Sequence, residues 1–189
     1  GLFEQFSGAI YDLNMSEVQV ESATGFYNNL GTLAAKMNND VHIENVHITG
    51  VVSFSPTSGP ETSKVGGLFG EYVGTGEVSI LESSFDGSVE GPGTAGGLFG
   101  RVLFTGEGVL EVQDCSGSGT VSGRQAGGLI GSAAGVIEDS SFDGDVSGIF
   151  KAGGLIASFG GDLRNSSTSG TVSVNAWTGS AGGIVGNLG

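Results

Sequence analysis

The sequence predicts an all-β protein, a parallel β-solenoid of about six coils. Two observations lead to this fold class. A phrase of two glycines, two apolar residues and a small residue returns at intervals of 26 to 35 residues, and short β-rich runs punctuated by Gly, Asn and Asp fill each interval. Six units near 30 residues indicate a repeat architecture, and such short runs do not suit helices of useful length. Right-handed winding is expected from the rule for parallel crossovers.

The repeat can be followed from residue 1. Its clearest copy is VGGLFGEYVG at residues 65–74, with near-copies starting at Ala95, Ala126, Ala152 and Ala181. The residue before the Leu of each copy sets the phase, and these residues are Gly1, Thr32, Gly67, Gly97, Gly128, Gly154 and Gly183. We therefore expect one solenoid domain over 1–189, with degenerate coils at 1–64 and regular GGLxG coils at 65–189. Because the chain opens on the tail of a phrase and closes on the start of another, we expect a fragment of a longer protein.

A second phrase follows in each unit and aligns into columns, meaning residues at the same position of successive units. An aliphatic column holds Ile10, Ile43, Ile80, Val112, Ile137 and Leu163. A glycine column holds Gly50, Gly87, Gly119, Gly144 and Gly170, with Val52, Val89, Val121, Val146 and Val172 two residues later. We expect three strands in each repeat unit, at the phrases GGLFG, V-x-I-x-x-S and S-V-x-G. Columns then stack about 4.8 Å apart, the aliphatic ones fill the core, and the first and last coils have open edges that need a cap or neighbouring sequence.

The glycine pair indicates a corner where a Cβ atom would clash. The two positions after it are both apolar, which conflicts with the alternation of side chains along a strand. Either a local kink turns both columns inward, or one column forms an outward apolar stripe covered by another part of the protein or by a partner. These columns are Leu2, Leu33, Leu68, Leu98, Leu129, Leu155 and Ile184, then Phe3, Ala34, Phe69, Phe99, Ile130, Ile156 and Val185.

Composition limits the class of partner. The 189 residues include 38 glycines, and 20 acidic against 6 basic residues give a net charge of −14. Nucleic acid and anionic membranes need a basic face and are disfavoured as partners. No apolar stretch approaches the roughly 18 residues of a membrane span, and the single cysteine rules out an internal disulfide framework. This negative charge is compatible with a soluble surface protein, with a salty medium or with the binding of divalent cations.

The stretch from AGGLFG at Ala95 through VLEVQDCSGSGTVSG to AGGLIG at Ala126 resembles the GLUG-motif repeat of large bacterial surface and secreted proteins, which include adhesins and IgA-specific peptidases. The resemblance is clear from Val65 to Gly189 and weaker before it. It implies an extracellular, repeat-built, non-catalytic segment with no catalytic residues to carry over. The departing stretch NNLGTLAAKMNND in the first units is a candidate specialised end.

The most suggestive cluster is a polar column two residues after the aliphatic one, formed by Asp12, Asn45, Glu82, Asp114, Asp139 and Asn165. Stacked acids repel one another, so Ca²⁺ between coils is one interpretation. The other, which we favour, is a turn in which these side chains accept hydrogen bonds from nearby backbone N–H groups. Two of the six are neutral Asn, and no EF-hand or nonapeptide calcium motif occurs.

Other candidates have plain structural interpretations. Cys115 shares a column with Ser83, Ser140 and Ser166 and is expected to be a small buried residue, since no His lies in its unit. His42 and His47 are five apart, which places them on opposite faces of a strand and disfavours a shared metal; we expect outward polar positions.

Basic and aromatic residues supply two further candidates. A basic residue precedes three of the Gly-Gly pairs: Lys64, Arg124 and Lys151. These residues are either turn charges that keep the protein soluble or a basic line that contacts an acidic glycan or a flanking domain. Trp177 lies in a loop between strands, either exposed to stack on a sugar or buried as a lid over the last coil.

We predict a non-catalytic structural or adhesive segment of an extracellular, bacterial cell-surface or secreted protein, acting as a rigid spacer or a ligand-presenting module. It has no catalytic, metal or cofactor residues, Ca²⁺ being the one candidate ion. Expected partners are flanking repeats or domains, and a glycan or host-cell ligand. Two alternatives remain: an ice- or surface-binding solenoid, for which Ser88, Thr120, Asp145 and Thr171 are too irregular, and a β-helical polysaccharide enzyme, for which basic residues are few. A binder would use the irregular insertions at 22–39 and 56–64.

Overall fold

The computed structural model describes residues 1–23, 29–55 and 62–189. Its strands join in one sheet, and every pairing between them is parallel. The strands are β1 (Phe3–Ser22), β2 (Asn29–Leu30), β3 (Ala34–Phe54), β4 (Lys64–Gly66), β5 (Phe69–Gly74), β6 (Glu77–Leu81), β7 (Ser84–Glu90), β8 (Thr94–Gly96), β9 (Phe99–Phe104), β10 (Val109–Gln113), β11 (Ser116–Gly127), β12 (Ile130–Glu138), β13 (Ser141–Gly153), β14 (Ile156–Arg164), β15 (Ser167–Ser169), β16 (Val172–Val174), β17 (Ser180–Gly182) and β18 (Val185–Leu188).

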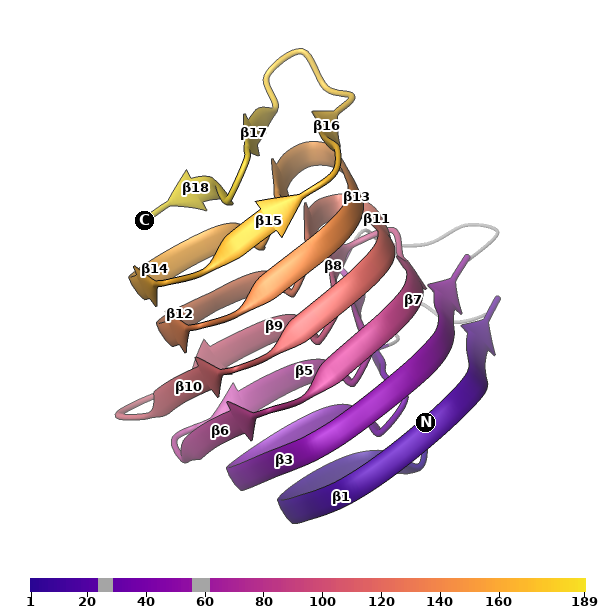
Figure 1. Ribbon diagram of the computed structural model, residues 1–189, viewed down its shortest axis with the longest axis vertical. Helices are drawn as coiled ribbons and strands as arrows, with labels where there is room; N and C mark the ends of the chain where they lie inside the picture. Colours follow the sequence, from indigo (N-terminus) through magenta and orange to yellow (C-terminus); the bar gives the residue numbers. More distant parts are fainter. Residues whose placement is uncertain (24–28, 56–61) are drawn as a thin grey trace.

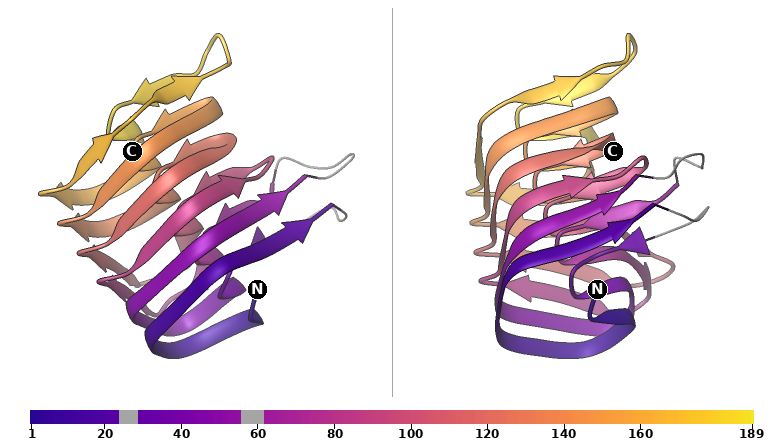
Figure 2. Two further views of the ribbon diagram at one scale, coloured as in Figure 1. Left: turned by 45° about the vertical axis from the view of Figure 1, so that its right-hand side comes forward. Right: turned by 90° about the vertical axis from the view of Figure 1, so that its right-hand side faces the viewer.

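The chain winds as a solenoid, which confirms the predicted fold class (Figure 1). One coil runs from β8 through β9 and β10 into β11, whose last residues pair with β8 and so begin the next coil. The coils lie on one another as stacked bands in the turned views (Figure 2). In Figure 1 the chain climbs from the N-terminus, passing leftward through the fainter rear strands such as β9 and rightward through the front strands such as β11. This path is a right-handed winding, as expected for parallel crossovers.

The strand registers reproduce the columns inferred from the sequence. In the aliphatic column Ile43 pairs with Ile80, Ile80 with Val112, and Val112 with Ile137. The valines behave in the same way, because Val89 pairs with Val52 on one side and Val121 on the other. The residues of both columns are almost completely buried between Val41 and Phe159. Equivalent aliphatic residues therefore stack along the axis and fill the interior of every coil.

The repeated glycine phrase is a corner between two strands, and not the single strand expected from the sequence. The chain bends at Gly67 and Leu68, between β4 and β5. A Cβ atom on Gly66 would lie 1.9 Å from the carbonyl oxygen of Phe69 in the same corner, and one on Gly67 would lie 2.0 Å from the carbonyl oxygen of Gly97 in the next coil. The first glycine lets the chain turn back on itself, and the second lets adjacent corners stack.

The corner also explains the two adjacent apolar columns. Leu68 and Phe69 have no exposed surface, and the same holds for Leu98 and Phe99 in the next coil. The bend interrupts the strand alternation, so that both side chains enter the core. The interpretation of an outward apolar stripe is wrong for these coils. In the first and last coils of the described stack, Leu2 is 54% and Ile184 40% exposed.

Among the described residues, no helix is long and apolar enough to cross a membrane.

The corner geometry predicts that Gly97→Ala destabilises the protein, whereas Gly160→Ala does not. A Cβ atom at Gly97 would approach the Gly128 carbonyl oxygen to 2.3 Å, but the nearest atom to one at Gly160 is 3.9 Å away. Because backbone cannot move aside without breaking a ladder, we expect Gly97→Ala to lower the free energy of unfolding by more than about 2 kcal/mol, and Gly160→Ala to change it by about 0.5 kcal/mol or less. Urea denaturation followed by circular dichroism measures both; equal losses would contradict this account of the corner.

Candidate functional site

The acidic column forms a second corner of each coil. All six of its residues have left-handed backbone, with φ between 47° and 54°. Asn and Asp tolerate this conformation better than most residues, and five of the six corner residues are Asp or Asn, the sixth being Glu82. The favoured interpretation of this column as a turn agrees with its backbone, whereas the expected acceptance from backbone N–H groups stays a prediction, because the hydrogen bonds shown for these side chains go to other side chains. A neutral Asn in this column can form a hydrogen bond with the acidic residue of the neighbouring coil: Asn45 Nδ2 donates to Asp12 Oδ1 at 2.7 Å.

In three coils the residue after the acidic corner is a serine that links this corner to the preceding coil. Ser140 Oγ donates to the carbonyl oxygen of Glu138 at 2.8 Å and accepts from the backbone N–H of Cys115 at 3.2 Å. Ser83 and Ser166 do the same in their coils, with bonds of 2.7 Å to the carbonyl two residues earlier. One small hydroxyl therefore satisfies a carbonyl exposed by the turn and an N–H group of the neighbouring coil.

Cys115 occupies this serine column and is buried, as expected. Its Sγ lies 3.2 Å from the carbonyl oxygen of Gln113 and 3.4 Å from that of Ile80. Burial raises the pKa of the thiol to about 12, and hydrogen bonds only partly offset this shift. The thiol therefore stays protonated at neutral pH and does not act as a nucleophile.

Both histidines point outward, and they are joined to separate polar groups. His42 Nε2 lies 3.0 Å from Glu44 Oε2. His47 Nε2 lies 3.0 Å from Asn45 Oδ1, and its Nδ1 lies 2.9 Å from Ser84 Oγ. The expectation of opposite faces is wrong, because the corner at Asn45 reverses the alternation between them. In the part of the chain that the structure describes, no three His, Cys, Asp or Glu side chains are grouped as metal ligands.

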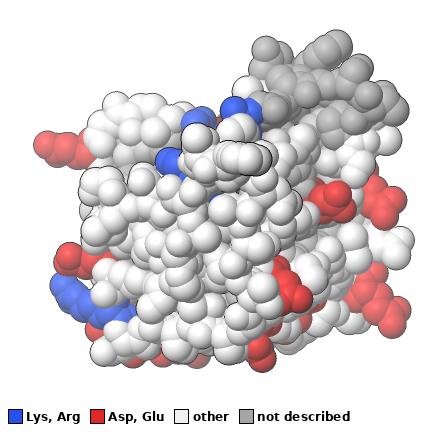
Figure 3. Space-filling view, turned by 90° about the horizontal axis from the view of Figure 1, so that it is seen from above, with Lys and Arg blue, Asp and Glu red and all other residues white. Residues whose placement is uncertain are grey.

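Two of the predicted basic residues share one column. Lys64 pairs in register with Thr94, Thr94 with Gln125, and Gln125 with Lys151. Arg124 lies beside this ladder at a register shift, with its guanidinium carbon 4.5 Å from the centre of the Phe150 ring. Seen from above, the visible Lys and Arg atoms form two small groups, whereas Asp and Glu atoms are spread around the outline (Figure 3).

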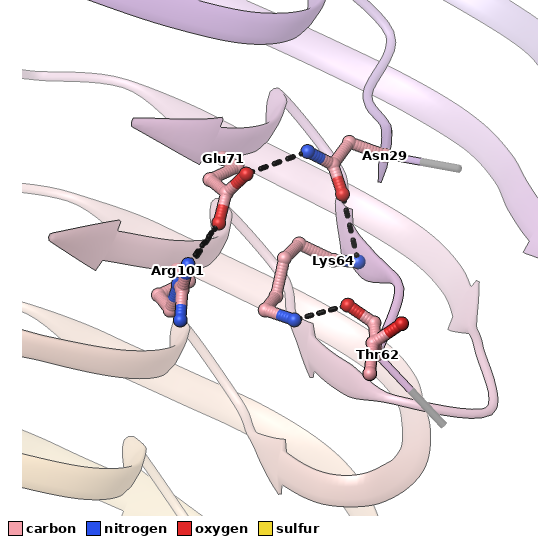
Figure 4. A network of polar contacts seen from close by, with 5 residues as sticks. All are labelled: Asn29, Thr62, Lys64, Glu71 and Arg101. Atoms are coloured by element: carbon pink, nitrogen blue, oxygen red, sulfur yellow. Dashed lines mark hydrogen bonds and ion pairs between the residues drawn. The ribbon is translucent and has the colours of Figure 1, made fainter. Parts of the chain in front are cut away.

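Lys64 belongs to a polar network that the sequence did not reveal (Figure 4). Glu71 accepts from Arg101 Nε at 2.9 Å and from Asn29 Nδ2 at 2.8 Å, while the Lys64 ammonium donates to the carbonyl oxygen of Thr62. Burial and the nearby Arg101 charge lower the pKa of Lys64, against the opposing effect of Glu71. The pairing of Arg101 with Glu71 in register could have been read from the repeat, because both lie two residues after the Phe of their phrases.

Trp177 is completely exposed, in the loop that joins β16 to β17. The interpretation of Trp177 as a buried lid is therefore wrong. The irregular insertions at 22–39 and 56–64 lie partly outside the described residues.

A groove of about 470 Å³ crosses five coils on the side where the front strands end. Its lining residues include the three consecutive column members Gly91, Gly123 and Gly148, and the serines Ser122 and Ser147 beside them. A glycine follows the S-V-x phrase in each of these coils, but this position points into the coil, as the buried Phe54 does one coil earlier, so the glycines alone did not indicate a groove.

The chain is similar in sequence to a short segment of a much larger protein. It is 31% identical over 145 residues to halomucin of Haloquadratum walsbyi, an alignment that covers 68% of this chain and 2% of halomucin. The chain thus spans about one fiftieth of the length of that relative. No protein-family model matches the chain, and no solved structure matches it.

The environment of Cys115 predicts that its thiol resists alkylation in the folded protein. At mildly alkaline pH iodoacetamide should label it far more slowly in buffer than in urea, where the pKa returns to near its ordinary value of 9.0 and the side chain is accessible. Mass spectrometry measures the labelling. The Cys115→Ser variant, which restores the residue used in neighbouring coils, should remain folded with an unfolding free energy within about 1.5 kcal/mol of the parent. Equal labelling with and without urea would contradict the burial.

Proposed function

We propose that this chain is a non-catalytic structural segment of a cell-surface or secreted protein, in which the stacked coils form a rigid spacer. The observation that carries the proposal is the parallel pairing of equivalent residues from the first described coil to the last, with local register shifts in the β1–β3 and β11–β13 pairings. A stack held by parallel ladders, buried aliphatic columns and serine bridges has no hinge between its described coils. Its length depends only on the number of repeats.

The surface location rests on two supports. The similarity to a short segment of halomucin is consistent with a repeat region of a large surface protein. The net charge of −14 keeps a protein soluble and discourages association with other acidic surfaces. The finer proposal, that the chain is a GLUG-type repeat of a bacterial adhesin, rests on the phrase AGGLFG and its copies.

The partners that we propose first are neighbouring coils or domains of the same protein. At the N-terminal edge Leu2 and Phe3 are about half exposed, although the equivalent residues of inner coils are fully buried. Leu188, at the other edge, is 72% exposed. A further coil stacked on either edge would bury these side chains and pair the open strand. The proposal includes no catalytic group and no bound cofactor.

The spacer predicts that two copies joined in phase form one longer rod. Gly183 has the same phase as Gly1, so residues 1–182 followed directly by residues 1–189 restore the GGLF phrase at the junction. Six added coils about 4.8 Å apart should lengthen the particle by about 29 Å without changing its cross-section, as measured by small-angle X-ray scattering. The control joins the same two copies through a Gly/Ser linker, which gives a flexible pair of particles. If the in-phase fusion scatters like the linked control, the spacer proposal is wrong.

A further inference from the structure

Two tripeptides of the chain have the N-x-S form that is the acceptor motif for N-linked glycans in secreted proteins. They are Asn-Met-Ser at 14–16, within β1, and Asn-Ser-Ser at 165–167, at the turn between β14 and β15. The sugar is bulky and is joined to the Asn side chain. The motif can therefore act only where the Asn amide and the hydroxyl two residues later are accessible, and the two copies differ in this respect.

The second copy lies on a projecting turn. Asn165 is the left-handed residue of the last acidic corner, with φ of 48°. This turn lies on the outline of the molecule, at the left of Figure 1, where β14 ends and β15 begins. Asn165 and Ser167 are both exposed. A motif on such a turn can enter the cleft of an enzyme, whereas the backbone of a motif within a ladder is bonded to neighbouring strands.

The fold uses only the middle residue of this motif. Ser166 Oγ donates to the carbonyl oxygen of Arg164 at 2.7 Å and accepts from the backbone N–H of Ser140 at 3.2 Å. In the described part of the chain, the side chains of Asn165 and Ser167 form no hydrogen bond. The corner thus fixes the motif to the preceding coil and leaves its amide and its outer hydroxyl available to a transferase.

The same corner in other coils lacks the complete motif. Asn45 is followed two residues later by His47, and its side chain is held between that imidazole and Asp12. Other coils have Ser at the later position but an acidic residue at the corner, as in Asp139 with Ser141. Asn and Ser coincide only in the last of these six corners.

The first copy of the motif lies in a less open position. Asn14 belongs to β1 and pairs in register with His47 of β3, so its backbone is part of a ladder. The His47 imidazole is already bonded to Asn45 and Ser84. Asn14 and Ser16 are nevertheless exposed. This copy therefore shows what the motif does without the projecting turn.

We propose that Asn165 is an acceptor for an N-linked glycan. The donor is an oligosaccharide joined through phosphate to a membrane lipid. A bond forms between Asn165 Nδ2 and the anomeric carbon of the first sugar, and the bond from that carbon to the phosphate oxygen breaks. The lipid phosphate leaves with the electron pair, and the amide proton passes to a base of the transferase.

The proposal rests on the surface location proposed above, since the motif is modified in secreted proteins. It adds a chemical role for one corner of the spacer. A glycan on this turn would project sideways from the stack (Figure 1). It would leave the strand edges at the two ends open to further coils.

The test is transfer of glycan to the folded chain by membranes of the cells that make this protein, which hold both the transferase and its donor. Peptide mapping by mass spectrometry should find sugar on the peptide that contains Asn165. Ser167→Ala should abolish this modification, whereas Ser167→Thr, which keeps the hydroxyl, should preserve it. Circular dichroism should show the same β structure in both variants, because the Ser167 side chain is exposed.

A gained site and a lost site serve as controls. Asp139→Asn creates Asn-Ser-Ser at the same corner of the preceding coil, and we expect sugar there too. Asn165→Asp installs the residue used at Asp139 and should lose the modification while the chain remains folded. Sugar on Asn14 but not on Asn165, sugar on neither, or sugar that persists in Ser167→Ala would each overturn the proposal. Fractionation of the producing cells measures the location separately, so an exported protein without sugar would contradict the glycan and not the surface role.

Discussion

The whole structure depends on one constraint, which is that every residue must be acceptable beside its own equivalent about 4.8 Å away. A side chain that fits a single coil but not a stack is excluded at that position. Gly67 shows this most directly, because a Cβ atom there would collide with the carbonyl oxygen of Gly97. The phrase is thus repeated because each corner must stack on the same corner of the next coil. The aliphatic columns recur in the core for the same reason.

The constraint also explains how so acidic a chain can stack. Identical carboxylates in successive coils would repel one another, and the outward columns of the front strands avoid this by alternation. Asp86 and Asp143 are separated by Ser118 in the coil between them. On the rear strands Glu71 lies in register with Lys36 on one side and Arg101 on the other. The net charge is therefore large, while these neighbours along the strands are neutral or opposite in sign; the exception is the corner column, where Glu82, Asp114 and Asp139 follow one another in successive coils.

The fold could be predicted because one phrase repeats along the whole chain, and this period is stronger evidence than the pattern within any single strand. The period fixed the coils, and the columns fixed the register, as Ile43, Ile80 and Val112 show. Local strand alternation was the less reliable guide. It placed His42 and His47 on opposite faces and left the direction of Leu68 and Phe69 open, because a left-handed residue or a glycine pair resets the alternation at each corner. The groove and the network around Glu71 arise between segments that meet only after the chain has wound, so no single stretch of sequence indicates them.

The serine bridges give the stack a mechanical property. Each bridge, such as that of Ser140 to Cys115, ties a coil only to its immediate neighbour, and the two termini lie at opposite ends of the stack (Figure 1). Under tension the outermost coil, which is held on one side alone, would yield first. Unwinding one coil of 26 to 35 residues frees on the order of 100 Å of extended chain, in place of the 4.8 Å that it occupied. Such an array would lengthen under load in steps and dissipate work at each one, while the coils behind the break remain stacked.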